Sequence, residues 1–587
     1  MALQDDRTAK MRRDVGVELG LALSGGGFRA ALFHIGVLAR LAELDLLRHV
    51  EAISTVSGGS IVGVLYYLHV KRLLETKPDG EIRREDYVDI VAQLERDFLE
   101  AVQRNIRTLA LASPVANLRM AFGGYSWTER LAELYESRFY APMHGAPNPL
   151  PMKDLLVRPD GAKFSPAEHN ASRVRAKVPM LFVNATTLNT GRGWVFTQTW
   201  MGERYGKAVD HDPSVNAILR GLYYDQALGT YRTVAAATAV AASACVPGLF
   251  PPLRLAGLFE GWSVLLVDGG VHDNQGLGAL EEYGCRHVVV SDGSGLMEDA
   301  REPSPLRPGV AARSNSVLQA RVRELTLRPV TGPAGHVVVH LKDGIPPEEV
   351  TALNLPPVDH PGASVTPNGV NPGVQQALAR VRTDLDAFSD VEADALMADG
   401  YLIASRRLAG ASLAAASLAP PVPGPEHGWR FRWMIPHLGR PESEPRLLPH
   451  LRAGQRRLFK AWSTVRPLRA LTIGAGLATA LLLCGFVWEH WNDAWDRTFR
   501  IHLSWRAVAA AVAAALGLVA ATGLSIRARI RAARITIGVA ASVLGWIVLG
   551  LYLLLLNPLF LAAGRRPRSA QQPSWVRAPR APGPASP

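Results

Sequence analysis

Three long stretches without a charged residue lie near the C-terminus and constrain the fold of this chain most. They span 470–488, 507–525 and 535–556. Each is long enough for a helix to cross a hydrocarbon layer of roughly 30 Å. The alternative is a set of three buried helices in a soluble protein, but the lack of polar interruptions favours the membrane. The sequence therefore predicts three transmembrane helices between 470 and 556.

The arginines around these stretches predict an orientation. The loop after the middle stretch contains no acidic residue and holds Arg527, Arg529, Arg531 and Arg534. Basic loops tend to stay on the cytoplasmic side of a membrane. Residues 1–17 carry charges but lack the apolar core of a secretory signal. We therefore expect a multi-pass protein of a bacterial-type inner or plasma membrane, with its N-terminal domain in the cytoplasm and its tail on the opposite side.

The composition changes along the chain and divides it into segments. The 587 residues are enough for more than one domain. We expect an N-terminal extension over 1–17, a folded domain over 18–400, and a linker with a basic juxtamembrane segment over 401–469. The transmembrane helices would follow over 470–556, and a Pro- and Arg-rich tail, disordered by composition, over 557–587.

The positive charge of the chain is concentrated in its C-terminal part. The whole chain has a net charge of +12, while the part from Glu426 onward holds 22 Arg and Lys against six Asp and Glu. These arginines flank apolar stretches, so we expect membrane lipids with anionic headgroups as partners and no nucleic acid. The three cysteines, Cys245, Cys285 and Cys484, are too few and too scattered for a disulfide framework or a Cys-based zinc site.

Short β-branched segments alternate with helical patterns in the N-terminal 300 residues. The strand-like segments read VELGLALS, VEAISTVS, LFVNATTL, SVLLVD and HVVVSDG, and a helical pattern covers about 30–45. Such alternation is typical of a parallel sheet covered by helices. The sequence therefore predicts an α/β fold.

A run of three glycines follows the first predicted strand. Gly25, Gly26 and Gly27 stand where the strand should turn into a helix. Glycines at such a turn let the backbone approach an anion, and N–H groups at the helix start can donate to it. No Gly-Lys-Ser/Thr follows, and the G-x-G-x-x-G spacing is absent, so neither a P-loop nor a dinucleotide site is predicted.

Ser57 lies between an apolar strand and an apolar helix and is followed by Gly58 and Gly59. A nucleophile elbow needs small neighbours for its sharp turn, and the N–H after the serine can stabilise an oxyanion. Thr55 stands where the G-x-S-x-G pattern has glycine. An ordinary helix start is the alternative for this segment.

Asp268 ends another apolar strand and is followed by two glycines. We expect it at the carboxyl end of a parallel strand, the edge where α/β enzymes place their chemistry. It could instead cap the turn, which is the role we expect for Asp273 and Asn274.

These three motifs in this order, together with ASACVPGLFPP at 242–252, resemble the patatin-like phospholipases over about 18–295. The resemblance implies a three-layer α/β fold with a central, mostly parallel sheet. It also implies a Ser57–Asp268 dyad that hydrolyses lipid esters without a metal or cofactor, and a supporting residue in Arg29, which would hold the loop or a headgroup phosphate. The oxyanion would be held by Gly25, Gly26, Gly27 and Gly58.

Alternatives remain for the base and for the reaction. An Asp with an ordinary pKa near 4 is a poor base, so burial must raise the pKa of Asp268. His272 or His34 could serve as the base of a triad instead. His336 and His340 could begin a metal site, although a plain strand explains them. The same dyad could transfer the acyl group or cleave a thioester, or the protein could be a catalytically silent lipid-binding membrane protein.

Overall fold

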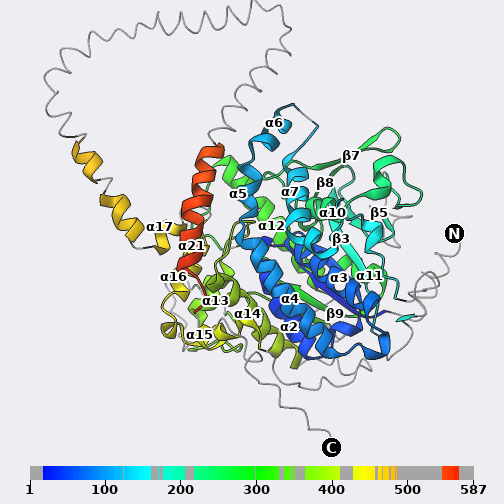
Figure 1. The fold of residues 1–587 in the computed structure, drawn as a ribbon, viewed down its shortest axis with the longest axis horizontal. Coiled ribbons are helices and arrows are strands. Elements are labelled where there is room, and N and C mark those ends of the chain that lie inside the picture. Colours follow the sequence, from blue (N-terminus) through cyan, green and yellow to red (C-terminus); the bar gives the residue numbers. More distant parts are fainter. Residues whose placement is uncertain are drawn as a thin grey trace, which may run out of the picture. The chain divides into compact units, whose positions relative to one another are not determined.

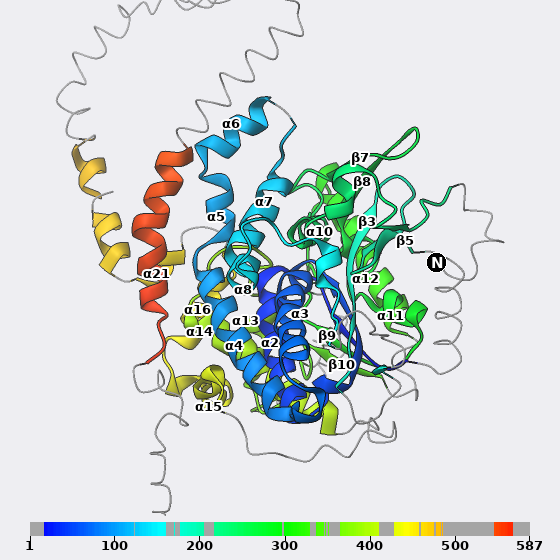
Figure 2. The ribbon, with the colours of Figure 1, turned by 45° about the vertical axis from the view of Figure 1, so that its right-hand side comes forward.

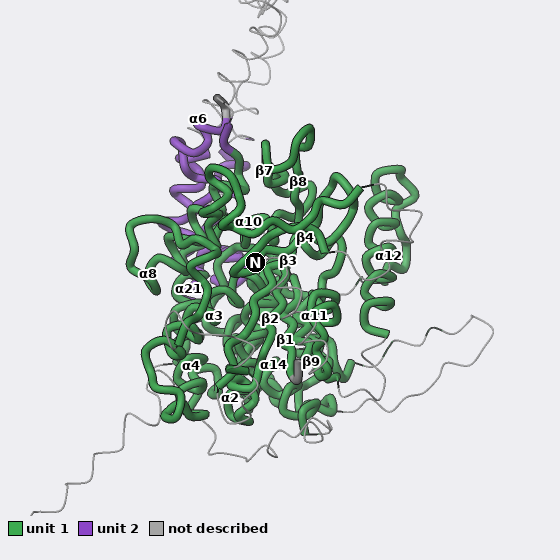
Figure 3. Tube along the Cα trace, turned by 90° about the vertical axis from the view of Figure 1, so that its right-hand side faces the viewer, with its two compact units in different colours: residues 1–107, 126–457, 564–587 green, residues 108–125, 458–563 purple. Residues whose placement is uncertain are grey.

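The structure is a computed structural model, and the chain in it forms two compact units. The model describes residues 17–567 except 123, 160–168, 171–175, 205–216, 296, 298, 329–335, 346, 348–349, 351–363, 410–427, 457–459, 466, 475–476, 483 and 485–544. The first unit comprises residues 1–107, 126–457 and 564–587, and the second comprises 108–125 and 458–563 (Figure 3).

The first unit is built on one mixed, ten-stranded sheet. Its strands lie in the order β10-β9-β1-β2-β3-β4-β5-β6, and β8 joins β3 to β7. Their bounds are β1 Val17–Leu23, β2 Val50–Val56, β3 Met180–Thr187, β4 Gly193–Phe196, β5 Trp200–Glu203, β6 Leu222–Tyr223, β7 Leu253–Phe259, β8 Trp262–Asp268, β9 Cys285–Asp292 and β10 Val337–His340.

The expectation of a mostly parallel sheet is wrong for half of it. From β10 to β3 all neighbours are parallel, but β4, β5, β6, β7 and β8 pair antiparallel. The links from β3 to β4 and from β4 to β5 are too short for a crossover helix, so they can join only antiparallel neighbours.

Helices cover both faces of the sheet (Figures 1 and 2). The first face carries α2 Gly27–Glu43, α3 Gly58–Thr76, α4 Arg84–Gln103, α10 Ala236–Ser243 and α14 Asp390–Ala409, and the second carries α11 Leu277–Tyr283. The remaining helices are α5 Ile106–Leu111, α6 Pro114–Phe122, α7 Trp127–Tyr135, α8 Ala141–His144, α12 Arg307–Leu327, α13 Pro372–Ala379, α15 Ile435–Gly439, α16 Leu447–Gly454, α17 Lys460–Thr464 and α21 Asn557–Ala563. The α/β class predicted from the alternating segments is confirmed.

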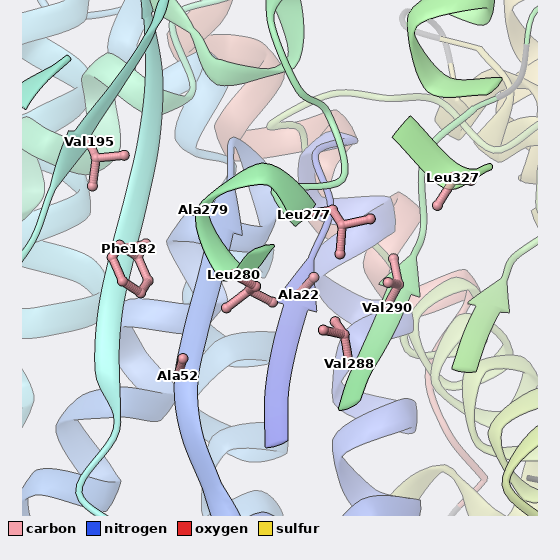
Figure 4. Packing of buried hydrophobic residues seen from close by; sticks show 10 residues of the cluster. All are labelled: Ala22, Ala52, Phe182, Val195, Leu277, Ala279, Leu280, Val288, Val290 and Leu327. Carbon is pink, nitrogen blue, oxygen red and sulfur yellow. The ribbon is translucent and has the colours of Figure 1, made fainter. Parts of the chain in front are cut away.

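The α11 face of the sheet is closed by small and branched side chains. Ala22 of β1 and Val290 of β9 pair in register, and both pack with Leu277 and Leu280 of α11 (Figure 4). Side chains alternate between the two faces of a strand, so the neighbouring residues of β1 point to the α2 and α3 side. The sheet is thus buried on both faces at its parallel half.

Helices α2 and α14 approach each other closely on the opposite face. A Cβ at Gly36 would lie 1.8 Å from the carbonyl oxygen of Met397, and one at Gly400 would lie 2.3 Å from that of Phe33. Only glycine permits this backbone contact. Helix α14 runs past the domain boundary expected at residue 400, and the segment from Arg430 to Gly454 also folds within the first unit.

Among its described residues, the second unit contains one helix that is long and apolar enough to cross a membrane. It spans Gly545–Ala563, has a mean hydropathy of 2.1 and is 11% buried. A shorter apolar helix covers Pro467–Leu482, and the predicted middle helix, 507–525, lies outside the described residues. The long helix extends past the predicted end at 556. Residues 564–567, which the sequence places in the tail, belong to the first unit.

Candidate active site

The pairing of β3 brings Ser57 and Asp268 together. Strand β2 runs parallel to β3 and ends with Val56 opposite Asn184, while β8 runs antiparallel and ends with Asp268 opposite Ala185. Both strands pair with the same edge of β3 but run in opposite directions, so their carboxyl ends face each other. The expectation that Asp268 ends a parallel strand is wrong, yet the antiparallel arrangement is what places it beside Ser57.

Ser57 has the strained backbone of a nucleophile elbow. Its φ is 51° and its ψ is −118°, a conformation that a residue with a side chain rarely adopts. Its amide donates to the Ser243 hydroxyl over 2.9 Å, and Ser60 bonds to the same hydroxyl over 2.8 Å. The turn between β2 and α3 is therefore braced from α10.

Thr55 fits at the elbow because a glycine elsewhere makes room for it. A Cβ at Gly63 of α3 would lie 2.5 Å from the Thr55 Cγ2 atom. The Thr55 hydroxyl donates to the carbonyl of Phe182 over 3.1 Å and accepts from Ser60 over 3.0 Å. The departure from G-x-S-x-G is thus compensated by α3.

The glycine run forms a tight turn directly against the elbow. Gly26 and Gly27 have φ values of 140° and 60°, which favour glycine. A Cβ at Gly58 would lie 2.1 Å from the carbonyl oxygen of Gly27, and one at Gly25 would lie 3.2 Å from the Cβ of Ser57. The loop and the elbow are therefore in backbone contact.

Three amides of this loop and elbow can donate to a ligand. The Gly25 amide is already bonded to the Asn274 carbonyl at 3.0 Å. Within the described part of the chain, the amides of Gly26, Gly27 and Gly58 have no acceptor. Gly27 and Gly58 each begin a helix, where the first N–H groups have no intrahelical partner. Of the four predicted oxyanion residues, Gly25 contributes close packing while the other three retain free donors.

Asp268 is buried and has no cation beside it among the groups that set its pKa. Its Oδ1 atom accepts from the Gly270 amide over 2.7 Å. Burial raises the pKa of Asp268 to about 6, and the Gly270 amide and the nearby Ser57 side chain oppose this rise. From the sequence, we expect burial to raise the pKa of Asp268 if this residue acts as a base, and the pKa is raised.

Arg29, two residues after the glycine run, is hydrogen-bonded to segments that are distant in sequence. Its guanidinium donates to the carbonyls of Gly293, Ala379 and Val381 over 3.3, 3.3 and 2.8 Å. The residue is 3% exposed, and burial lowers the pKa of Arg29 to about 10. Of the two roles that the resemblance implied, these contacts favour support of the loop.

Neither candidate histidine is placed as a base for Ser57. The His34 ring bonds to the Ser291 hydroxyl at 2.6 Å and to the Ser24 carbonyl at 2.9 Å, and burial lowers the pKa of His34 to about 4. Burial and the nearby Arg204 charge lower the pKa of His272. The structure describes both rings and Ser57, and neither ring is hydrogen-bonded to the serine. His34 instead holds β9 against the glycine loop.

The histidine pair expected on a strand does lie at β10. His340 ends this strand, with its Nε2 atom 3.8 Å from Asp292. In the described residues no group of three or more His, Cys, Asp or Glu side chains could hold a metal ion. The predicted strand is present, with His340 at its end and His336 directly before its first residue.

Several supporting residues were not predicted from the sequence. Asp273 caps its turn as expected, but Asn274 does more: its Oδ1 atom would lie 2.3 Å from a Cβ at Gly25 and 2.5 Å from one at Gly270. Asp384 accepts from the Phe28 amide over 3.1 Å at the start of α2. Asp384 is far from the motifs in sequence, and no local pattern marks it.

A protein-family model matches residues 21–280 and is described as Patatin-like phospholipase. Residues 21–280 belong to the patatin-like phospholipase family. At the level of the family, the patatin-like domain is a lipid acyl hydrolase domain. The matched region includes Ser57 and Asp268 and ends before Asp384, so the segments that brace the loop from behind lie beyond it.

The chain also has distant matches among solved structures. Human GIVD cytosolic phospholipase A2 with methyl gamma-linolenyl fluorophosphonate and terbium chloride has a TM-score of 0.33 and 14% identity, over 70% of this chain and 62% of that chain. VipD from Legionella pneumophila has a TM-score of 0.25 and 13% identity, over 94% and 89% of the two chains. The chain thus spans less than two thirds of the human enzyme. No curated protein matches it.

Proposed function

We propose that the protein is a membrane-associated serine hydrolase that cleaves the carboxylic ester bonds of lipids, with Ser57 as nucleophile and Asp268 as base. The observation that carries this proposal is the meeting of the carboxyl ends of β2 and β8 on one edge of β3, which brings the Ser57 side chain next to a buried carboxylate whose pKa is raised to about 6. A base with such a pKa accepts a proton more readily than an exposed aspartate, and it is still ionised at neutral pH.

The first step forms an acyl-enzyme. The Oγ atom of Ser57 bonds to the carbonyl carbon of the ester, and the hydroxyl proton passes to Asp268. The electron pair of the carbonyl moves to its oxygen, which the amides of Gly26, Gly27 and Gly58 would stabilise. The bond to the alcohol oxygen then breaks, and that oxygen takes the proton from Asp268.

The second step releases the fatty acid. A water molecule attacks the acyl carbon while Asp268 accepts one of its protons. The ester bond to Ser57 breaks, and the serine oxygen recovers the proton from Asp268. The dyad ends in its starting state, and no step needs a metal or a cofactor.

The substrate should reside in a bilayer. The helix Gly545–Ala563 is exposed along most of its length and apolar, and arginines are concentrated in the C-terminal part of the chain. Exposed apolar helices insert into lipid, and arginines attract anionic headgroups. We therefore place the protein at a membrane, with its patatin-like domain facing the cytoplasm and acting on membrane lipids.

A fluorophosphonate probe tests the nucleophile. It should label the full-length protein at Ser57, and Ser57→Ala should remain unlabelled while retaining the circular dichroism spectrum of the wild type. In parallel, wild-type protein should release free fatty acid from phospholipid vesicles. Labelling at another serine would overturn the assignment of Ser57. Acyl transfer to an added alcohol without fatty-acid release would change the reaction to a transfer, and no turnover of any lipid ester would indicate a silent binding protein.

A further inference from the structure

The chain returns to the first unit immediately after the apolar helix. The carbonyl of Gly564 accepts from the Val391 amide over 3.1 Å, and the amide of Arg566 donates to the Asp390 carboxylate over 2.9 Å. The Arg565 carbonyl accepts from the Arg446 guanidinium over 2.9 Å. Residues 564–566 are therefore all hydrogen-bonded to other residues of the first unit, which contains the patatin-like domain.

The Arg566 side chain enters a buried acidic site. Its Nε and one terminal nitrogen donate to the two carboxylate oxygens of Asp394 over 2.9 and 2.6 Å, and both side chains are at most 1% exposed. The Trp433 indole donates to the same carboxylate over 2.6 Å. This is a bidentate contact, in which the planar guanidinium of arginine donates two parallel hydrogen bonds to one carboxylate.

The acidic site is built for a cation. Burial, and next the Asp394 charge, raise the pKa of Glu95 to about 7, while Arg566 opposes that shift. Burial alone would lower the pKa of Arg566, but Asp394, Glu95 and Asp390 raise it above its ordinary value. Without the arginine, Asp394 would be a buried carboxylate that has no ion-pair partner among the described residues, which is strongly unfavourable. Arg566 therefore completes the fold of this region.

The C-terminal segment of the second unit, 458–563, begins and ends at neighbouring points. The Nζ atom of Lys460, near the start of this segment, lies 4.2 Å from the centre of the Phe560 ring, near its end. The chain leaves the first unit after residue 457 and returns at residue 564. Whatever path the intervening chain takes, both of its ends are attached to one folded body.

We propose that residues 564–566 form a C-terminal latch that keeps the chain after the apolar helix on the same side of the membrane as the patatin-like domain. The sidedness rests on the membrane attachment of the proposed function, whereas the latch itself does not. A folded domain lies on one side of a bilayer, so the chain between 458 and 563 crosses it an even number of times. This replaces the three crossings that the apolar stretches predicted.

Hydrogen exchange of the full-length protein in mild detergent tests the latch. The Val391 amide lies in the first turn of α14, where its only acceptor is Gly564, so it should be protected in the wild type. Arg566→Gln should lower this protection by about 100-fold, on the scale of breaking a buried ion pair. The matched control is Arg565→Gln, whose exposed side chain should leave the protection unchanged. An unprotected Val391 amide in the wild type would overturn the latch, even if the variant failed to fold.

The sidedness is tested with protease on sealed membranes of expressing cells. Tags at the N-terminus and the C-terminus of the full chain should both be removed or both be protected. Removal of one tag with protection of the other would overturn the proposal. If the protein does not sediment with membranes, the membrane attachment and the sidedness both fail, while the exchange of Val391 still decides the latch.

Discussion

Two aspartates stand at equivalent points of the sheet and have opposite electrostatic properties. Asp268 ends β8 and Asp292 ends β9, each is buried, and each is followed by glycine. Burial raises the pKa of Asp268 to about 6, and its partners are the Ser57 side chain and a backbone amide. Burial also opposes ionisation of Asp292, but His340, Arg323 and Ser294 hold the pKa of that carboxyl below its ordinary value.

The neighbours therefore decide the role of a strand-end aspartate, and the local sequence does not. The Nε atom of Arg323 donates to Asp292 over 3.1 Å, and a terminal nitrogen of the same guanidinium forms an ion pair with it at 3.0 Å. This carboxylate is therefore a fixed anion that cannot take up a proton near neutral pH. Asp268 has only neutral donors and can gain and lose a proton. Asp292, which is paired with a cation, has a structural role, whereas Asp268, which is not, can act as a base.

The largest expected difference between the two aspartates is the effect of their substitution on turnover. Ser57→Ala, Asp268→Asn and the double variant should all fall to one common residual rate, about 10⁴-fold or more below the wild type, because residues that act as a unit are not additive. Asp292→Asn should retain most of its turnover when folded. The measurement is kcat for fatty-acid release from vesicles. Wild-type turnover in Asp268→Asn would contradict the dyad.

The glycine loop lies between the two strand ends, and a methyl group there should harm turnover. A Cβ at Gly26 would lie 2.9 Å from the Ala30 side chain and 3.1 Å from the Gly293 carbonyl oxygen, at a φ of 140°. Gly26→Ala should therefore lower kcat by about 10²-fold, as expected for displaced oxyanion donors. Gly261→Ala is the control, since Gly261 also has a positive φ but an open surrounding. Equal losses in both variants would mean that strain alone is responsible.

Stability at pH 7.5 should change in opposite directions for the two aspartates. Asp268→Asn removes a charge that burial disfavours and should stabilise the fold by about 2 kcal/mol. Asp292→Asn breaks a buried ion pair and should destabilise it by about 2 kcal/mol. Urea unfolding of full-length protein measures both. Destabilisation by Asp268→Asn would show that its hydrogen bonds outweigh the burial of its charge.

The pH dependence is the finest test. The pKa of Asp268 is higher in the folded state, so the folded protein binds more protons between about pH 4 and pH 6, and its stability falls as the pH rises through that window. The base must be ionised, so kcat/KM should fall below about pH 6. Both effects should persist in Asp292→Asn, and the stability effect should vanish in Asp268→Asn. A kcat/KM that stays flat down to pH 4 would exclude Asp268 as the base.

The positions of the two proposed catalytic side chains could be predicted from the sequence, but the pairing of their strands could not. The order of motifs placed Ser57 after one strand and Asp268 at the end of another. That β8 runs antiparallel along β3 follows from the β7–β8 pairing and from contacts between distant segments. Likewise the sequence shows Thr55 as a departure from the motif, while the space for it comes from Gly63, eight residues later on α3.

The sequence by itself determined the α/β class, the strand ends that carry the proposed site residues, and the apolar character of the C-terminal helix. These follow from local periodicity and turn residues, which act over a few positions of the chain. Only the tertiary structure decided which strand-end aspartate has a cation, which loop amides remain free, and that Arg566 returns to Asp394. The charge pairs join residues that are 31 positions apart for Asp292 and Arg323 and 172 positions apart for Asp394 and Arg566, so no local pattern encodes them.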